Sequence, residues 1–369
     1  MSGGTRLSEI CTRITDGTHY SPKDEGEGRA FISVKDMGDA GIDFEGCFHI
    51  GEAAFAQVKA SGSVPVAGDI LFSKDGTVGK VAVVPEGAEF GVLSSIAILQ
   101  PDHEVVDSRY LAQVLKSPDT LADALGRKTG SALRRLILKD LKGIRVPLPP
   151  LEEQRRIAHL LDEADRLQRL RKEANEKAKR ILPALFVEMF GDPETNPKGW
   201  EVKSLGELVK VKSGDFLPAK AMSPQGGFPV YGGNGVSGYH DEFMFSESTI
   251  VVGRVGQACG AVHHAPPCSW VTDNALCVVE KSADLNESYL VDALTAARLR
   301  QYAAHADLPS LSGARLAPVP ILVPPADVQE RYASLRSDVL AVVARQKTAS
   351  ERLADGVGVA RSRLFAETI

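Results

Sequence analysis

The sequence predicts the fold class α+β, with two similar globular domains separated by a long antiparallel two-helix coiled coil and related by an internal pseudo-twofold repeat. Three observations support this prediction. A set of short motifs occurs twice in the same order, short apolar runs lie between Gly and Pro turn signals, and two long stretches carry a regular apolar seam.

The repeat is anchored by a Pro-Pro pair with a Gln four positions after the second Pro. This motif occurs in VPLPPLEEQRRI (Val146–Ile157) and again in ILVPPADVQERY (Ile321–Tyr332). Four weak matches that keep one order indicate two diverged copies of one unit. The other three pairs are RLSEI (Arg6–Ile10) with SLGEL (Ser204–Leu208), GDILFSKDGTVGKVAVV (Gly68–Val84) with STIVVGRVGQACGAVHH (Ser248–His264), and RYLAQVL (Arg109–Leu115) with SYLVDAL (Ser288–Leu294).

Each copy begins with an irregular region in which short apolar runs lie between turn residues. One helical stretch is expected in each copy, near Tyr110–Leu125 and near Tyr289–Ala304, so the pattern favours a mixed α+β globule over alternating βαβ units. The predicted strands are Phe31–Val34, Asp69–Phe72, Val81–Val84, Ile96–Leu99 and Ile144–Val146, then Phe228–Tyr231, Thr249–Val252, Leu276–Val279 and Val319–Val323.

Each copy ends in a long predicted helix, the first over Leu151–Phe190, with apolar residues at alternating three- and four-residue steps. Such a seam is typical of a coiled coil, and two helices of one chain pair most simply antiparallel. We expect Pro183 to kink or stop the first helix, and Gly356 and Gly358 to weaken and bend the second. The seam residues are Ile157, Leu160, Ala164, Leu167, Ala174, Ala178, Ile181 and Leu185, then Tyr332, Leu335, Val339, Val342, Ala349, Leu353 and Ala360.

The composition sets limits on the function. The chain has 369 residues, of which 43% are hydrophobic and 25% charged, as in a globular protein with real cores. A formal net charge of −5 excludes a strongly basic nucleic-acid coat but not a local basic surface. Five cysteines without a CxxC pair suit a reducing compartment, and neither a signal peptide nor a membrane-length apolar stretch is visible. We therefore expect a soluble, intracellular protein that does not bind membranes.

Two similar globules on a rigid rod suit a partner that is itself periodic and two-fold symmetric, and duplex DNA is the obvious candidate. Residues 1–150 hold 17 Lys and Arg against 20 Asp and Glu, yet Arg127–Arg145 holds seven basic residues and one acid, Asp140. A solvated loop and helix would explain this segment, but its Gly-Ser turn and cations also suit phosphates. The candidate phosphate contacts are Arg127, Lys128, Arg134 and Arg135, with Arg315 in the aligned stretch Leu308–Arg315.

Base recognition needs donors and acceptors that reach the major groove. We expect them in the Gly-rich turns beside the predicted strands, where Arg254 aligns with Lys74 and either residue can equally touch phosphate. The candidates in the first copy are Thr18, His19, Tyr20, Lys23, Lys74, Thr77 and Lys80, and those in the second are Tyr231, Asn234, Arg254, Gln257, Thr272 and Asn274.

The order of the parts resembles the specificity (S) subunit of type I restriction–modification systems. In this order a globule is followed by PLPPLEEQRRI and a long helix, then by a second globule, VPPADVQERY and another helix. The stretch Ala184–Leu208 is similar to the family's connection between a helix and the next recognition domain, and YGGNGVSGY (Tyr231–Tyr239) resembles one class of target-recognition domain. The second copy departs from the Leu-x-Glu-Gln form, because it has Ala326-Asp327-Val328-Gln329.

The resemblance implies a non-catalytic, DNA-reading subunit with target-recognition domains at 1–146 and 191–322 and spacer helices at 147–190 and 323–369. Each recognition domain would read half of a bipartite target in double-stranded DNA, and the helices would set the gap. Two methyltransferase (M) subunits, which use S-adenosylmethionine, would bind the helices, and restriction (R) subunits with ATP and Mg would join to cleave DNA in a prokaryotic cytoplasm. The chain itself would hold no cofactor. The expected partner surface includes Arg155, Arg156, Arg166, Arg169 and Arg171.

Two alternatives remain open at the level of sequence. The first is a coiled-coil protein–protein adaptor whose globules have no DNA specificity. The second is a zinc site, since Cys259, His263, His264 and Cys268 lie within ten residues, although their spacing is unusual and buried thiols with surface histidines explain them better. No methyltransferase loop of the Asn/Asp-Pro-Pro-aromatic type is present, and DGTVGK (Asp75–Lys80) lacks the spacing of a phosphate loop.

Overall fold

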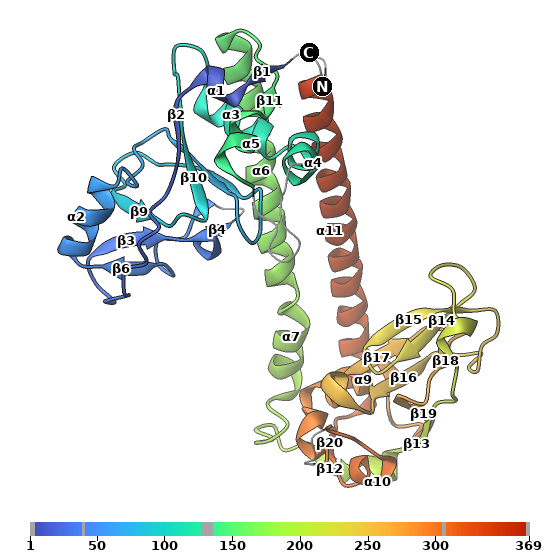
Figure 1. Ribbon diagram of the computed structural model, residues 1–369. Coiled ribbons are helices and arrows are strands. Elements are labelled where there is room, and N and C mark those ends of the chain that lie inside the picture. Colours follow the sequence, from blue (N-terminus) through green and yellow to red (C-terminus); the bar gives the residue numbers. More distant parts are fainter. Residues whose placement is uncertain (1–3, 39–40, 127–135, 305–307, 367–369) are drawn as a thin grey trace. The chain divides into compact units, whose positions relative to one another are not determined.

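The computed structural model describes residues 4–38, 41–126, 136–304 and 308–366. The chain forms two compact units: unit 1 comprises Met1–Glu173 and Thr348–Ile369, and unit 2 comprises Ala174–Lys347. In Figure 1, unit 1 carries the blue and cyan strands and unit 2 carries the yellow and orange ones. Unit 1 is therefore built from two stretches of chain that are far apart in sequence.

Unit 1 contains an antiparallel four-stranded sheet in the order β2-β10-β7-β8. A second sheet has the order β6-β3-β9, in which β3 and β9 run parallel, and two further strand pairs are β1–β11 and β4–β5. The strands are β1 (Thr5–Arg6), β2 (Cys11–Asp16), β3 (Arg29–Ile32), β4 (Met37–Gly38), β5 (Gly41–Ile42), β6 (Phe48–Ile50), β7 (Ile70–Ser73), β8 (Val81–Val83), β9 (Phe90–Val92), β10 (Ile96–Pro101) and β11 (Arg145–Val146).

The helices of unit 1 complete its core. The helix at Ser108–Leu115 begins where the Asp107 carboxylate accepts hydrogen bonds from two backbone N–H groups, a standard N-cap. Tyr110 in this helix is fully buried, and its hydroxyl donates to the carbonyl of Pro147 at 3.0 Å. The helices are α1 (Leu7–Ile10), η1 (Val34–Asp36), α2 (Glu52–Ala60), α3 (Ser108–Leu115), α4 (Pro118–Gly126), α5 (Leu138–Lys142) and the first part of α6 (Leu151–Ala178).

Unit 2 repeats this architecture. Its four-stranded sheet has the order β13-β19-β16-β17, and its three-stranded sheet, β15-β14-β18, again contains one parallel pair, β14–β18. The strands are β12 (Glu201–Ser204), β13 (Val209–Ser213), β14 (Phe228–Gly232), β15 (Gly235–His240), β16 (Thr249–Gly253), β17 (Val262–Ala265), β18 (Trp270–Val271), β19 (Ala275–Lys281) and β20 (Pro320–Val323). The helices are α7 (Ile181–Phe190), α8 (Leu205–Leu208), η2 (Ala219–Ala221), η3 (Gly256–Ala258), α9 (Glu287–Ala296), η4 (Leu299–Tyr302), α10 (Gly313–Leu316) and α11 (Ala326–Ala366).

The repeat predicted from sequence is confirmed at the level of single bonds. Asn286 caps α9 as Asp107 caps α3, and the buried Tyr289 hydroxyl donates to the carbonyl of Leu322 at 2.8 Å, as Tyr110 does to Pro147. The predicted strands all fall on observed strands, with ends that differ by one or two residues. The fold class, α+β with an internal repeat, is therefore confirmed.

The Gln of the repeated Pro-Pro motif joins each long helix to its own globule. In unit 1 the Gln154 amide oxygen accepts from the Asp107 N–H at 2.9 Å, and its nitrogen donates to the carbonyls of Val105 and Pro149 at 3.0 and 2.7 Å. In unit 2 Gln329 makes the same three bonds, with the Asn286 N–H and with the carbonyls of Asp284 and Pro324. Both side chains are buried.

The prediction of one helix over Leu151–Phe190 is wrong in one respect, because α6 ends at Ala178 and α7 starts at Ile181. Pro183 lies in the first turn of α7, where no N–H is needed for a helical bond, so the break precedes it. α11 continues through Gly356 and Gly358 without interruption. The helical stretches expected near Tyr110–Leu125 and Tyr289–Ala304 are each divided into two shorter helices.

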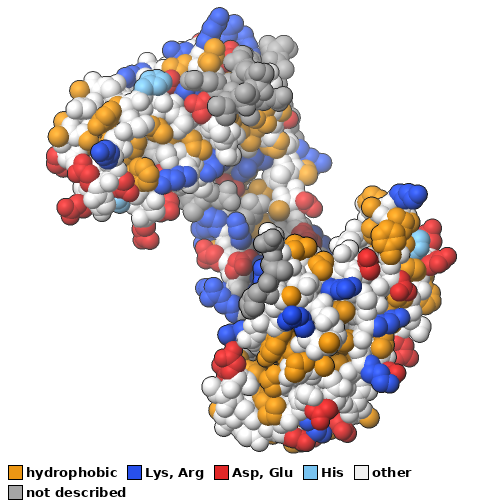
Figure 2. Space-filling view, turned by 60° about the horizontal axis from the view of Figure 1, so that its bottom comes forward, with side chains coloured by type: hydrophobic (Ala, Val, Ile, Leu, Met, Phe, Trp, Pro, Cys, Tyr) orange, Lys and Arg blue, Asp and Glu red, His pale blue; other side chains and the backbone are white. Residues whose placement is uncertain are grey.

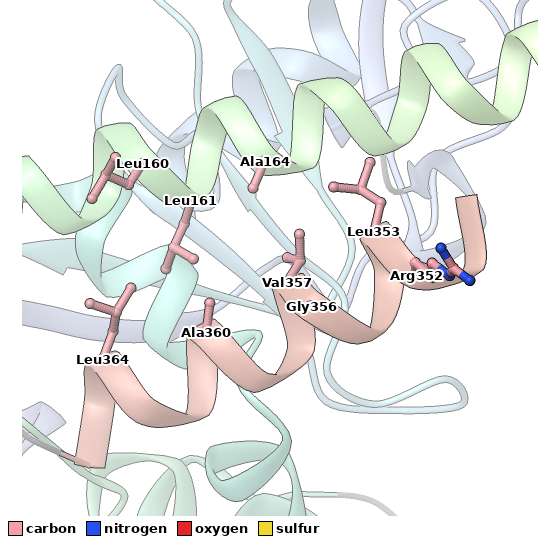
Figure 3. Close-up of a pocket in the computed structure, with 9 residues that line it drawn as sticks. All are labelled: Leu160, Leu161, Ala164, Arg352, Leu353, Gly356, Val357, Ala360 and Leu364. Carbon is pink, nitrogen blue, oxygen red and sulfur yellow. The ribbon is translucent and has the colours of Figure 1, made fainter. Parts of the chain in front are cut away.

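In unit 1, α6 packs antiparallel against the C-terminal part of α11. Figure 3 shows Leu161 on α6 and Val357 and Leu364 on α11 facing a common space, a pocket of about 380 Å³. Phe365 on α11 is buried and lies with its ring centroid 5.9 Å from that of Tyr110. In unit 2, α7 supplies Phe186 and Phe190 to an aromatic cluster with Tyr289 and Tyr332. Across the described part of the chain, no helix is both long and apolar enough to cross a membrane.

Candidate nucleic-acid interface

The six residues predicted to read DNA in the second copy are brought to one end of the sheets of unit 2. The Thr272 N–H donates to the carbonyl of Tyr231 at 2.8 Å, and the Arg254 N–H donates to the carbonyl of Asn274 at 3.0 Å. Gly233 packs so closely that a Cβ there would lie 3.2 Å from the Asn274 carbonyl. We call this set the unit 2 cluster: Tyr231, Asn234, Arg254, Gln257, Thr272 and Asn274.

The polar groups of the unit 2 cluster differ in their availability. Asn234, Gln257 and Asn274 are exposed, and Arg254 is half-buried, with Nη1 3.2 Å from the Ser213 hydroxyl and 3.4 Å from the Asp273 carbonyl. Thr272 is only 6% exposed, and within the described residues its hydroxyl oxygen has no hydrogen-bond partner. A buried polar group without a partner is costly, so this hydroxyl marks a place where a ligand or water would be stabilising.

A seventh residue, His263, belongs to this region but was not predicted as a DNA contact. Its Nε2 lies 3.1 Å from the carbonyl of Gly233, and its ring centroid lies 6.5 Å from that of Tyr231. Burial raises the pKa of the Tyr231 hydroxyl, and the neighbouring Tyr239 raises it further, so Tyr231 is a neutral donor and acceptor near pH 7. The alternation of β17 places His263 in this region, a signal that was hidden by its assignment to a zinc cluster.

Unit 1 places Lys74 at the position that Arg254 occupies in unit 2. The Lys74 N–H donates to Ser95 just before β10, as the Arg254 N–H donates to Asn274 just before β19. The carbonyls of Lys74 and Arg254 accept from Leu136 and Leu311, respectively. The alignment of Lys74 with Arg254 is therefore confirmed.

The Lys74 side chain is nevertheless only 1% exposed, and its Nζ lies 3.3 Å from Asp16 and 3.7 Å from Asp75. In this conformation Lys74 is committed to an internal ion pair, which disfavours a direct base contact. Lys80 is half-buried, and its Nζ donates to the carbonyl of Val34 at 2.8 Å, while Thr77 is exposed in the turn after β7.

The early loop of unit 1 lies beside Lys74. The Thr18 N–H donates to Val92, and the Thr18 carbonyl accepts from Ser94, next to the Ser95 that binds Lys74. Thr18 is buried, whereas His19, Tyr20 and Lys23 are exposed. The structure thus brings Thr18–Tyr20 and Lys74 together, and their role in DNA contact stays a prediction.

Four of the predicted phosphate contacts, Arg127, Lys128, Arg134 and Arg135, lie outside the described residues. The aligned segment of unit 2 is described from Leu308 onward: Gly256 N–H donates to the carbonyl of Pro309, and Ser312 caps α10 with a hydrogen bond to Arg315 N–H. Arg315 is exposed. On the face of unit 2 shown in Figure 2, exposed hydrophobic side chains lie between scattered basic and acidic ones.

The basic residues predicted to bind partner subunits lie along α6. Arg155, Arg156, Arg166 and Arg171 are exposed, and Arg169 is half-buried. Arg156 pairs with Glu153 at 2.6 Å and Arg166 with Glu163 at 3.1 Å, each one helical turn away. The seam beside them is only partly covered, since Leu160, Leu167 and Leu170 are each 46–48% exposed.

The four residues of the alternative zinc site face different partners. The Cys259 thiol lies 3.4 Å from the Arg254 carbonyl, His263 faces Gly233, and His264 pairs with Glu287 at 2.7 Å. Burial raises the pKa of the Cys259 thiol, which disfavours the thiolate that zinc requires. Among the described residues, no group of three or more His, Cys, Asp or Glu side chains is placed to hold a metal ion.

Comparison with known families and curated proteins gives a consistent similarity. Residues 6–180 and 197–352 match the type I restriction modification DNA specificity domain. The chain is 29% identical over 137 residues, 36% of its length, to the type I restriction enzyme EcoprrI specificity subunit of Escherichia coli. It is 33% identical over 175 residues, 42% of its length, to the MjaIX specificity subunit of Methanocaldococcus jannaschii. These matches span 34% and 39% of the two relatives, so the chain covers little more than a third of their length.

Comparison with solved structures extends over nearly the whole chain. The S subunit of a type I restriction-modification system from M. genitalium aligns with a TM-score of 0.65 and 16% identity, covering 98% of this chain and 96% of that one. A second structure, from a study of complex assembly and conformational transition of the type I R-M system, gives a TM-score of 0.59 at 16% identity, with coverage of 98% and 97%. At this identity the likeness concerns the fold.

Proposed function

This chain belongs to the family of type I restriction-modification DNA specificity domains, and from that premise we propose that it is the non-catalytic subunit that selects the DNA sequence. Each unit reads one half of a bipartite target in double-stranded DNA. The observation that carries the proposal is the repetition of one site: Lys74 in unit 1 and Arg254 in unit 2 occupy the same backbone position beside a Gly-rich turn. A duplicated site suits a ligand with two half-sites.

The proposal divides the contacts by their chemistry. In unit 2 the exposed amides of Asn234, Gln257 and Asn274 offer donors and acceptors to base edges, and amides of this kind recognise adenine through two hydrogen bonds. Exposed cations such as Lys23 and Arg315 suit phosphates, which fix orientation without reading sequence. The basic segment Arg127–Arg135 belongs to this second class in the proposal.

The long helices are the proposed binding surface for two methyltransferase subunits. This is supported by the incompletely covered seam at Leu160 and Leu167, by the exposed arginines of α6, and by the open pocket that Leu161 and Val357 line. S-adenosylmethionine would be bound by those subunits, and restriction subunits would add ATP- and Mg-dependent cleavage. This chain would hold no cofactor of its own.

A salt titration tests the proposal against the adaptor alternative. The chain is co-purified with its methyltransferase partner, and the target is found by mapping methylated adenines in the host genome. Binding of a target duplex is then measured from low to high salt. A DNA reader shows an observed binding constant that falls steeply with salt and prefers the target over a scrambled duplex, whereas an adaptor shows neither. The chain alone is expected to bind DNA weakly and without sequence preference.

A further inference from the structure

One loop with an exposed aromatic side chain occurs at the same place in both units. In unit 1 the chain leaves β2 through Gly17 and reaches Tyr20, followed by Pro22 and Lys23. In unit 2 it leaves β13 through Gly214 and reaches Phe216, followed by Pro218 and, two residues later, Lys220. The order Gly, aromatic, Pro, Lys is thus kept, although the second loop is one residue shorter between Gly and the aromatic residue.

The backbone holds both loops in the same way. Gly17 N–H donates to Ile96 and Thr18 N–H to Val92, and in unit 2 Gly214 N–H donates to Ala275 and Asp215 N–H to Val271. Neither glycine can carry a side chain, because a Cβ at Gly17 would meet the Leu93 carbonyl and one at Gly214 would meet the Val271 carbonyl. The loops therefore leave the sheets at a fixed point, and the aromatic residue follows within three positions.

The two rings lie in solvent although they are large and apolar. Tyr20 is 47% exposed, and Phe216 is 73% exposed, the most exposed of the large hydrophobic side chains in the described part of the molecule. An exposed aromatic ring costs free energy in water, and its repetition in both units indicates a use for it.

The neighbours of these rings indicate what covers them. The residue that precedes each glycine binds the cation of the site: Asp16 pairs with Lys74, and the Ser213 hydroxyl accepts from Arg254. In unit 2 the Asp215 carbonyl also lies 3.3 Å from the indole nitrogen of the half-buried Trp270. The unpartnered hydroxyl of Thr272, a 94%-buried residue by its 6% exposure, lies in the backbone segment against which Gly214 packs.

We propose that Tyr20 and Phe216 stack on nucleobases of the bound duplex, one ring in each half-site, and thereby distort or hold open the base stack beside the bases that are read. The proposal rests on the DNA-reading function and deepens it, because it assigns a sequence-tolerant stacking contact to a named residue in each unit. Aromatic and apolar side chains act in this way where proteins unstack base steps, and a cation beside the ring suits the adjacent phosphate.

A protein partner would explain one exposed ring, but it does not explain the pairing of the ring with a cation at both sites. A nucleic acid supplies a flat apolar face and a phosphate within one nucleotide, which matches the ring and the lysine three or four residues after it. Lys23 and Lys220 are both exposed.

The first test replaces Phe216 by Ala in the chain assembled with its methyltransferase partner. The Phe216→Ala complex should bind target DNA roughly ten-fold more weakly, because stacking on one base is lost. The slope of the binding constant against salt should not change, since no phosphate contact is removed. Tyr20→Ala should act similarly, and Tyr20→Phe should bind like the wild type. Val202→Ala, at a 51%-exposed position on β12, is the matched control and should not change binding.

The second test reads stacking directly. Phe216→Trp restores a larger ring, and the chain is labelled with 5-hydroxytryptophan so that its emission is separated from that of the partner subunits. Target DNA should quench the added emission of Phe216→Trp relative to the wild-type complex, and it should not quench that of Val202→Trp. The native Trp200 and Trp270 are present in all samples and are subtracted as background.

The outcomes separate this inference from the proposed function. If the wild-type complex shows no salt-dependent affinity for target DNA, the DNA-reading function itself fails. If the wild-type complex binds the target, while Phe216→Ala and Tyr20→Ala bind equally well and Phe216→Trp is not quenched, the stacking role is wrong and the function stands. A loss of affinity in Phe216→Ala with full recovery and quenching in Phe216→Trp supports stacking.

Discussion

Two buried glutamines, Gln154 and Gln329, explain why the Pro-Pro motif is followed by Gln in both copies. A primary amide has one oxygen that accepts and one nitrogen that donates twice, and each of these side chains uses all three capacities on backbone groups. Neither Leu nor Glu can do this, because Leu has no polar atom and Glu has no donor when ionised. The sequence motif is therefore a structural joint between helix and globule.

Replacing Gln154 by Leu should lower the free energy of unfolding of unit 1 by about 2–4 kcal/mol, because one buried N–H and two carbonyls lose their partner. Hydrogen–deuterium exchange of the α3 amides measures this change. Gln57→Leu, at an exposed position of α2, is the control and should change the exchange of α3 little. Equal protection in both variants would show that the joint is not needed.

At the scale of elements, the C-terminal part of α11 completes the core of unit 1. The Arg361 Nη2 donates to the Gln113 amide oxygen at 3.0 Å and to Asp165 at 2.8 Å, which links α11 to α3 and α6. Gln113 in turn donates to Asp162 and Asp165. Lys116 lies close to these groups, and burial lowers its pKa. The polar network fixes how the three helices meet, while Phe365 supplies the apolar contact.

The variant Arg361→Met should destabilise unit 1 by about 1–3 kcal/mol, less than for a fully buried ion pair because Arg361 and Asp165 are 15% and 19% exposed. Limited proteolysis and exchange at α3 should report the loss in unit 1 and leave α9 of unit 2 unchanged. Arg363→Met, at an exposed position on the same helix, is the matched control. A uniform loss in both units would contradict a local role.

The sequence predicted the elements more reliably than the exposure of individual side chains. Short apolar runs between turn residues located the strands because buried strands need little more than this pattern. The break between α6 and α7 was misplaced, since Pro183 is tolerated in a first turn and the helix ends two residues before Ile181. The burial of Lys74 was not predictable, because its partner Asp16 is distant in sequence and is brought close only by the sheet.

At the scale of the whole molecule, the proposed function makes the paired helices a ruler. An α-helix rises about 1.5 Å per residue and duplex DNA about 3.4 Å per base pair, so one heptad corresponds to about three base pairs. The exposed seam from Leu167 to Ala178 is the place where length can change without cutting into either globule.

Inserting seven residues within Leu167–Ala178, with a matched heptad in α11 between Leu335 and Ala349, should lengthen the gap between the half-sites by about three base pairs. The sequences of the half-sites should not change, because both reading sites are intact. Mapping methylated adenines in cells that express the variant measures the gap. Seven residues inserted after the exposed Gln225, in the loop before β14, should leave it as it was, and an unchanged gap in the helix variant would reject the ruler.

The division of the chain also sets the order in which its parts mature on the ribosome. Unit 2 is one continuous stretch and can fold as soon as it emerges, whereas the globule of unit 1 must wait for Thr348 and the residues after it. At about 5–20 residues per second, translation of the intervening unit takes on the order of 10 to 35 s. The half that is made first is thus completed last, and its unfinished apolar surface around Tyr110 is the part of the nascent chain most in need of a chaperone.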